Sequence, residues 1–262
     1  MNDFDVTSYL REITESLRKS DAYYFTVSFD SSYENDSSTA IYTHQFDKQI
    51  TLEVDKYELG LLGLDTYYSI PNITSSRNGN FRYSVDNGTT WKLVVVPTGS
   101  YELKTLGEKI TELVTPDTNG IVIVPDIALL KTRIKLISRI VIDFTYPNSI
   151  NYILGFNSRL VQGTGNHYSD NIVNIQPINS LNVHVDCIDN SYSNGKSSSA
   201  IFGFFPDVSP GEKIIIDRST PIYLPFNKTN LNSITVWITD QTNNLVNFRG
   251  ENINIRFHLR RK

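Results

Sequence analysis

The chain has 262 residues, of which 39% are hydrophobic and 20% charged, as is ordinary for a folded globular protein. Its formal net charge of -4 argues against binding nucleic acid through the overall field of the protein. The single cysteine, Cys187, excludes an intramolecular disulfide and a cysteine-based zinc cage. No apolar run approaches the roughly 20 residues of a membrane-spanning helix, and no signal peptide is recognisable. We therefore expect a protein that folds inside the cell, without a cofactor and without a membrane partner.

The N-terminal segment has the pattern of a helix. Its apolar residues recur with helical spacing at Val6, Tyr9, Leu10, Ile13 and Leu17. We assign residues 1–20 to an N-terminal helical arm. The arm either packs on the rest of the protein or reaches a neighbouring subunit.

Short alternating strands follow the arm. We predict strands at Tyr23–Phe29, 41–46 and 49–54, with a polar loop from Ser31 to Thr39. The stretch Tyr57–Ile70 is too apolar for a strand with one buried face, so we expect a central strand.

Two glycines interrupt this central stretch. Gly60 and Gly63 predict close packing or a β-bulge within it.

The middle of the chain mixes strands with short helices. Asn87-Gly88 predicts a hairpin turn, because both residues tolerate a positive φ. Tyr101–Val114 carries one apolar face and predicts an amphipathic helix. Strands are expected at 120–125 and 140–144, while 127–137 fits a helix or a strand.

The next segment is less regular. Residues 149–156 fit one helical turn that ends at Gly155, and Arg159–Asp170 fits a long loop or a domain junction.

The last third of the chain alternates apolar and polar residues with a period of two, as in Leu181–Cys187, Ser233–Thr239 and Asn252–Leu259. Such strands, separated by turn residues, predict an all-β, jelly-roll β-sandwich. Because about a dozen strands exceed the eight of one jelly roll, we expect extra strands or an insertion in the N-terminal half, with one or two short helices. We divide the chain into an N-terminal β region at 21–160 and jelly-roll strands at 161–262, or one continuous domain at 21–262.

No catalytic, cofactor-binding or metal site is expected from the sequence. The four histidines are His44, His167, His184 and His258, and none is spaced from another as metal ligands are. His184 and Asp186 share one face of a strand, which fits half a metal site or an ordinary polar face. We expect His184 and His258 at outward positions of their strands.

Two C-terminal features are candidates for contact with other molecules. Arg249, Gly250 and Glu251 form a turn whose charges fix the turn or reach a neighbouring subunit; Gly250 suits a positive φ. The end of the chain is basic, with Arg256, Arg260, Arg261 and Lys262. This basic end is either a solvated strand end or an inner surface that contacts packaged DNA.

Four motifs resemble those of one family. The C-terminal run Asp240–Arg261 contains F-R-G-E-N-I-N-I-R-F-H-L, and Tyr57-Glu58-Leu59-Gly60-Leu61 contains E-L-G-L. Pro97-Thr-Gly-Ser-Tyr precedes the predicted helix, and Ile153-Leu-Gly-Phe156 completes the set. In order and spacing these motifs are similar to those of the minor capsid, or penton, proteins of Polinton/Maverick-type elements and related viruses.

The resemblance implies a structural protein of the virion, made in the host cell cytoplasm. It implies a homopentamer at the icosahedral vertices that contacts the major capsid protein, with no enzymatic step. The alternative is a carbohydrate- or receptor-binding β-sandwich module, fibre-like and trimeric. In that case Trp91 and surface tyrosines would form the ligand platform.

Overall fold

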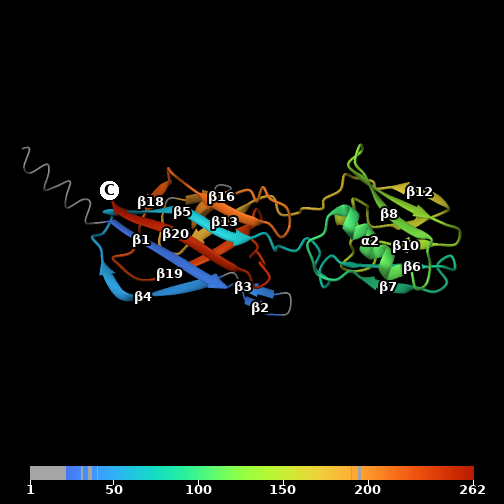
Figure 1. Cartoon of the computed structure of the whole chain (residues 1–262), viewed down its shortest axis with the longest axis horizontal. Helices are drawn as coiled ribbons and strands as arrows, with labels where there is room; N and C mark the ends of the chain where they lie inside the picture. Colours follow the sequence, from blue (N-terminus) through green and yellow to red (C-terminus); the bar gives the residue numbers. More distant parts are fainter. Residues whose placement is uncertain (1–21, 31, 35–36, 40, 190, 194–195) are drawn as a thin grey trace, which may run out of the picture. The chain divides into compact units, whose positions relative to one another are not determined.

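The computed structural model describes residues 22–30, 32–34, 37–39, 41–189, 191–193 and 196–262. Strands dominate, and the chain divides into two compact units (Figure 1). Unit 1 contains Ser38–Tyr68, Ser180–Lys262 and the described part of Met1–Tyr33, whereas unit 2 contains Ser69–Asn179 with the short segment Glu34–Ser37. The predicted N-terminal arm lies outside the described residues.

Unit 1 contains two sheets of antiparallel strands. One has the order β1-β20-β5-β17 with β18 also paired to β5, and the other has the order β16-β13-β19-β4. The bounds of the first sheet are β1 (Ala22–Asp30), β20 (Asn252–Arg261), β5 (Tyr57–Tyr67), β17 (Lys213–Asp217) and β18 (Tyr223–Pro225). Those of the second are β16 (Ala200–Phe204), β13 (Leu181–Val185), β19 (Asn230–Asp240) and β4 (Ile41–Thr51). A two-stranded sheet of β14 (Ser191–Ser193) and β15 (Lys196–Ser198) also belongs to unit 1, whereas β2 (Ser32–Glu34) and β3 (Ser37–Thr39) pair in a second two-stranded sheet with residues from both units.

The strand order is that of a jelly roll. Apart from β18 and the two-stranded sheets, the eight strands of unit 1 in chain order are β1, β4, β5, β13, β16, β17, β19 and β20. The first, eighth, third and sixth form one sheet, and the second, seventh, fourth and fifth form the other, as in a double-sheet jelly roll. The predicted all-β, jelly-roll class is confirmed. Unit 2 is inserted between the third and fourth of these strands.

Strand β5 is central, as its composition predicted. It pairs with β20 on one side and with β17 and β18 on the other, and Leu59, Leu61 and Leu64 are buried. The register with β20 passes from Arg256↔Gly63 to Phe257↔Leu61, so one residue of β5 bulges out of the ladder. The prediction of close packing or a bulge near Gly60 and Gly63 is therefore confirmed.

The inner faces of the two sheets supply the core of unit 1. Val27 of β1, Ile255 of β20 and Val236 of β19 are each 0% exposed. Across the sandwich, the ring of Phe29 on β1 stacks on Tyr42 of β4 with centroids 5.1 Å apart. Burial of these side chains removes apolar surface from water at roughly 25 cal/mol per Å², which stabilises the sandwich.

Unit 2 contains two small sheets, of order β11-β10-β6-β7 and β12-β9-β8, and two helices. The strands of the first sheet are β6 (Asn80–Ser84), β7 (Lys92–Val95), β10 (Val141–Asp143) and β11 (Leu160–Gln162). Those of the second are β8 (Ile121–Asp126), β9 (Lys131–Leu136) and β12 (Gly165–Tyr168), and the helices are α2 (Leu103–Val114) and α3 (Asn151–Leu154).

Helix α2 covers the strands of unit 2, as Figure 1 shows. Leu106, Ile110 and Val114 form its buried face, which confirms the predicted amphipathic helix. Gly107 lies against the carbonyl of Ile123 on β8, where a Cβ would clash with the backbone. The absence of a side chain at this position lets the helix approach the sheet closely.

Two local predictions of unit 2 are confirmed by positive backbone angles. The β6–β7 hairpin turns through Asn87 with φ 59° and Gly88 with φ 87°. Gly155 ends α3 in the left-handed region with φ 78°.

Other predictions were wrong. The predicted loop at Ser31–Thr39 contains β2 and β3, and the predicted loop or junction at Arg159–Asp170 contains β11 and β12. These strands are only three or four residues long, which is too short to show an apolar alternation; β2, β3 and β12 are also largely polar. The two strands predicted at 41–54 are the single strand β4.

The predicted domain boundaries differ from those of the structure. The predicted division near residue 160 falls inside unit 2, whose boundaries lie at 68/69 and 179/180. Strands β1, β4 and β5 join the C-terminal strands in one unit rather than forming a separate N-terminal region. A discontinuous unit depends on strand pairing over more than 200 residues, which local patterns do not reveal.

Candidate interaction surfaces

The basic C-terminal strand pairs its charges within unit 1. The Nε of Arg260 donates to Oε1 of Glu58 on β5 at 2.6 Å, and Arg261 reaches Glu53 at 2.9 Å. Arg256 lies over Gly63, with guanidinium nitrogens 3.7 Å from Asp65 and 3.8 Å from Asp217. The Nζ of Lys262 donates to the carbonyl of Asp55 at 3.1 Å. The four basic residues therefore do not form an unpaired positive patch.

An aromatic group lies beside these ion pairs. The ring of Tyr24 on β1 stacks on His258 of β20 with centroids 4.2 Å apart, and Tyr24 is 71% exposed. The hydroxyl of Tyr223 and Nδ1 of His258 share a hydrogen bond of 2.7 Å, and Arg260 lies 3.5 Å over the Tyr223 ring. Burial and then the charge of Arg260 lower the pKa of His258 below 6.5, because both disfavour the imidazolium.

Both histidines of the C-terminal strands lie at the expected outward positions, each between two core residues, but neighbouring side chains bury them. His258 is 9% exposed and His184 only 6%. The Nε2 of His184 lies 2.9 Å from the hydroxyl of Thr239, and its ring stacks on Trp237 at 5.3 Å. The period-two pattern did not predict this burial, because it does not show that Trp237 and Tyr24 stack on the two outward-facing rings.

His184 and Asp186 do not converge on one site. Strand β13 ends at Val185, and Asp186 accepts hydrogen bonds from the Thr235 amide at 2.9 Å and from Lys228 at 2.8 Å. Within the described ranges no group of three or more His, Cys, Asp or Glu could hold a metal ion. Burial raises the pKa of the Cys187 thiol, which leaves it protonated and unreactive at neutral pH.

The turn at Arg249, Gly250 and Glu251 is held by its backbone. Gly250 has φ 87°, as predicted, and Arg249 has φ 55°. The amide of Glu251 donates to the carbonyl of Phe248 at 3.1 Å, and that of Arg249 to Oδ1 of Asn247 at 2.7 Å. Among the ion pairs of the described residues, none joins Arg249 to Glu251. A contact of these charges with a neighbouring subunit stays a prediction.

Trp91, the candidate ligand platform, is engaged by a cation of its own unit. The guanidinium of Arg82 lies 4.8 Å from the Trp91 ring centroid and 5.4 Å from that of Tyr146. Arg82 also donates to the buried carboxylate of Asp143 at 2.6 Å. One face of the tryptophan is therefore occupied, which leaves less of it available to a planar ligand.

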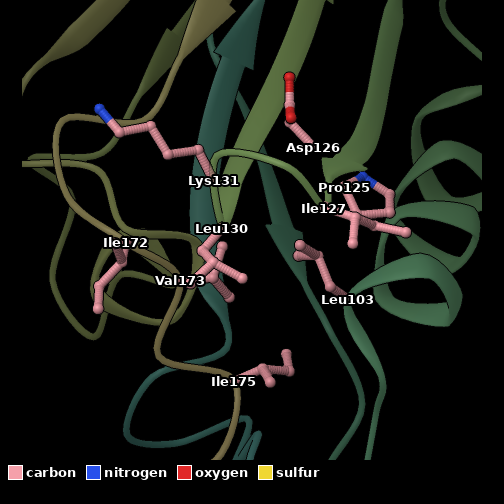
Figure 2. A pocket seen from close by; sticks show the side chains of 9 residues that line it. All are labelled: Leu103, Pro125, Asp126, Ile127, Leu130, Lys131, Ile172, Val173 and Ile175. Carbon is pink, nitrogen blue, oxygen red and sulfur yellow. The ribbon is translucent and has the colours of Figure 1, made fainter.

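The sequence did not predict an apolar groove in unit 2. It has a volume of about 290 Å³ and is lined by Leu103, Pro125, Asp126, Ile127, Leu130, Lys131, Ile172, Val173 and Ile175. Figure 2 shows the aliphatic side chains around a central hollow, with the charged groups of Asp126 and Lys131 at one rim. The groove lies between the start of α2, the turn from β8 to β9 and the segment after β12.

With its jelly roll and inserted unit, the chain has the architecture of an all-β sandwich protein, and no family model or curated protein matches its sequence. Among the solved structures that are similar to it are a penton protein and a chain of a virophage. The mavirus penton protein matches with 11% identity and a TM-score of 0.47, over 92% of this chain and 100% of that chain. A chain from the cryo-EM structure of the Sputnik virophage matches with 13% identity and a TM-score of 0.44, over 92% and 98%. The first of these two structures is described as a penton protein, the class of protein whose motifs the sequence resembles.

Proposed function

We propose that this chain is a structural protein of a virion. In this proposal it is a minor capsid, or penton, protein that forms a homopentamer at the icosahedral vertices and contacts the major capsid protein. Its action is self-association and docking, without a chemical step.

The observation that carries the proposal is the pairing of two motifs from opposite ends of the chain. The E-L-G-L motif at 58–61 lies on β5, and the N-I-R-F-H-L motif lies beside it on β20. Leu259 pairs with Leu59, and Arg260 pairs with Glu58 both in register and through its ion pair. The resembling residues thus build the centre of one jelly-roll sheet.

A ring suits this architecture. Five identical subunits close by rotation when one surface patch binds a different patch on the next copy. The turn at Arg249–Glu251 is one candidate for such a contact, because the side chain of Arg249 is exposed and the backbone holds the turn in a fixed shape.

Packaged DNA is the weakest of the expected partners. Contact with phosphates through Arg256, Arg260 and Arg261 would compete with three sets of ion pairs inside unit 1. We therefore keep the virion and the major capsid protein in the proposal and leave out DNA.

The test is electron microscopy of the purified protein, alone and mixed with the major capsid protein of the same element. The proposal expects five-fold rings, and pentamers that bind the major capsid protein. Rings of three would favour the alternative, a fibre-like binding module for carbohydrates or receptors. An Arg249→Ala variant that still forms rings would remove that turn from the subunit contact without affecting the proposal.

A further inference from the structure

The turn between β8 and β9 has an unusual composition for a hairpin. It consists of Ile127, Ala128, Leu129 and Leu130, and all four are exposed. Ile127 is 81% exposed, Leu129 55% and Leu130 63%. Hairpin turns normally contain Gly, Asn, Asp, Ser or Pro. Four consecutive exposed apolar residues add nothing to the stability of the fold, so their presence indicates a function.

The backbone holds this turn in a defined conformation. Leu130 has φ 52°, in the left-handed region that a leucine rarely adopts. The amide of Leu129 donates to Oδ1 of Asp126 at 3.1 Å, and the amide of Val173 donates to the Leu130 carbonyl at 2.9 Å. Neighbouring groups thus stabilise a strained residue that presents its side chain to solvent, a feature that concentrates at functional sites.

The apolar surface continues from the groove onto the exposed end of the hairpin. Ile127 and Leu130 line the groove, as Figure 2 shows, and Ile172 extends its open edge with 63% exposure. Leu129 and Ala128 lie outside the lining and still face solvent. A groove that binds one side chain of a protein partner does not need exposed apolar residues beside it. A deformable apolar phase, such as the acyl chains of lipids, would contact the groove and the exposed hairpin end together.

Basic residues follow the turn along β9. Lys131, Arg133 and Lys135 alternate with the buried Thr132, Ile134 and Leu136, so the three cations share the outer face of the strand. Five other cations of unit 2 form ion pairs: Arg82, Lys92, Lys104, Lys109 and Arg159. Within the described part of the chain, none of the three on β9 has a carboxylate within ion-pair distance; Lys131 instead donates to the Asp170 carbonyl at 3.3 Å.

We propose that the β8–β9 hairpin end binds the surface of an anionic lipid membrane. Ile127, Leu129 and Leu130 enter the boundary between headgroups and acyl chains, and the cations of β9 meet the lipid phosphates. The contact is peripheral, since no helix of the described residues is long and apolar enough to span a membrane. It departs from the expectation of no membrane partner and does not depend on the proposed vertex function.

The experiment is vesicle sedimentation of the intact protein with phosphatidylcholine vesicles, with and without phosphatidylserine. The protein should sediment with the mixed vesicles and far less with pure phosphatidylcholine, and added salt should weaken binding. The double variant Ile127→Ser/Leu129→Ser should lose at least about ten-fold in partitioning, because two aliphatic side chains no longer leave water. The double variant Arg133→Gln/Lys135→Gln should lose about five-fold in partitioning for each cation removed. This loss should be seen only with the vesicles that contain phosphatidylserine.

Matched controls come from the same unit. Leu93→Ser/Val95→Ser removes two exposed apolar side chains from β7, and Lys104→Gln removes an exposed cation from α2. Neither control should change partitioning, and circular dichroism checks that every variant is folded. Equal losses in the controls, or no sedimentation of the wild-type protein at millimolar lipid, would overturn the proposal. So would a tip variant that keeps vesicle binding but changes the mass of the protein, because the apolar tip would then bind a second copy.

Discussion

Two regions of the molecule differ in how their cations are paired: the outer face of the β1-β20-β5-β17 sheet in unit 1 and the β8–β9 hairpin in unit 2. On the sheet, Arg256 and Arg260 have carboxylate partners on neighbouring strands. On the hairpin, Arg133 and Lys135 have none among the described residues, and four apolar residues face solvent. The cations at the basic C-terminal end are thus neutralised by carboxylates of the same sheet, whereas the cations of the β8–β9 hairpin have no carboxylate partner among the described residues.

This difference shows that exposure and pairing, rather than residue type, identify an interaction surface. A run of cations in a sequence signals a partner only if the fold leaves the cations unpaired. An apolar run in a turn is more informative, because folding gives no reason for it.

The largest effect on stability should come from core truncations, each of which destabilises one of the two units. Leu64 of β5 and Ile110 of α2 are each 0% exposed, so Leu64→Ala and Ile110→Ala should each cost about 2–5 kcal/mol in the free energy of unfolding. In calorimetry, Leu64→Ala should lower the transition of unit 1 and Ile110→Ala that of unit 2. The exposed Ile41→Ala is the control, with a change below about 0.5 kcal/mol. Identical shifts of one shared transition would show that the units unfold together.

A glycine of the sheet tests the close approach of Arg256. A Cβ at Gly63 would lie 2.7 Å from the carbonyl of Ile216 and would also displace the Arg256 guanidinium. Gly63→Ala should therefore cost about 1–3 kcal/mol, measured as a lower urea midpoint. Gly203→Ala is the matched control, since its nearest neighbour is the movable end of the Asn182 side chain at 2.9 Å. Equal costs in the two variants would contradict the packing described for Gly63.

Acid should destabilise the two units in different pH ranges. The pKa values of His184 and His258 in unit 1 are lowered from 6.5 by burial, so the unfolded chain binds protons more readily. The folded state is therefore destabilised as the pH falls below 6.5, because the unfolded chain then binds protons that the buried histidines do not, whereas above pH 6.5 the two histidines cost no stability. In unit 2, hydrogen bonds from Ser84 and Thr90 lower the pKa of Asp86 from 3.8 to about 2, so its contribution is lost only between these values.

Thermal melts between pH 7.5 and 2 measure this difference. The transition of unit 1 should fall first, and His184→Gln should reduce its slope below pH 6.5. Asp86→Asn should remove part of the dependence of unit 2 below pH 4. His167→Gln, at a half-buried position in unit 2, serves as control. A transition of unit 2 that falls before that of unit 1 would contradict the assignment.

The smallest effect should come from the ion pair at the basic end. Glu58→Gln should cost no more than about 1 kcal/mol, because Arg260 is 45% exposed and solvent screens the pair. Arg260→Ala should cost more than Glu58→Gln, because it also removes the contact over Tyr223. Urea titrations measure both, and the reverse order would show that the charge alone matters.

The sequence predicted the strands whose apolar residues alternate or run continuously, such as β1, β5, β19 and β20. It also predicted α2 and the turns at Asn87-Gly88 and Gly155, where residue chemistry determines local geometry. It missed β11 and β12, which are only three and four residues long. It also missed the discontinuous unit 1, whose strands meet only through long-range pairing. The groove was not predictable, because Leu103, Leu130 and Ile172 meet only in the folded unit. The signal for the hairpin was present in Ile127–Leu130 but fitted a helix equally well.

The measurement that tests the central claim most directly is the mass of the purified full chain by light scattering over a concentration series, with and without the major capsid protein. The proposed vertex function predicts a closed species that contains five chains of 29.8 kDa each. This species forms either from the purified chain alone or once the major capsid protein is added. A stable species of three chain masses under both conditions would contradict it.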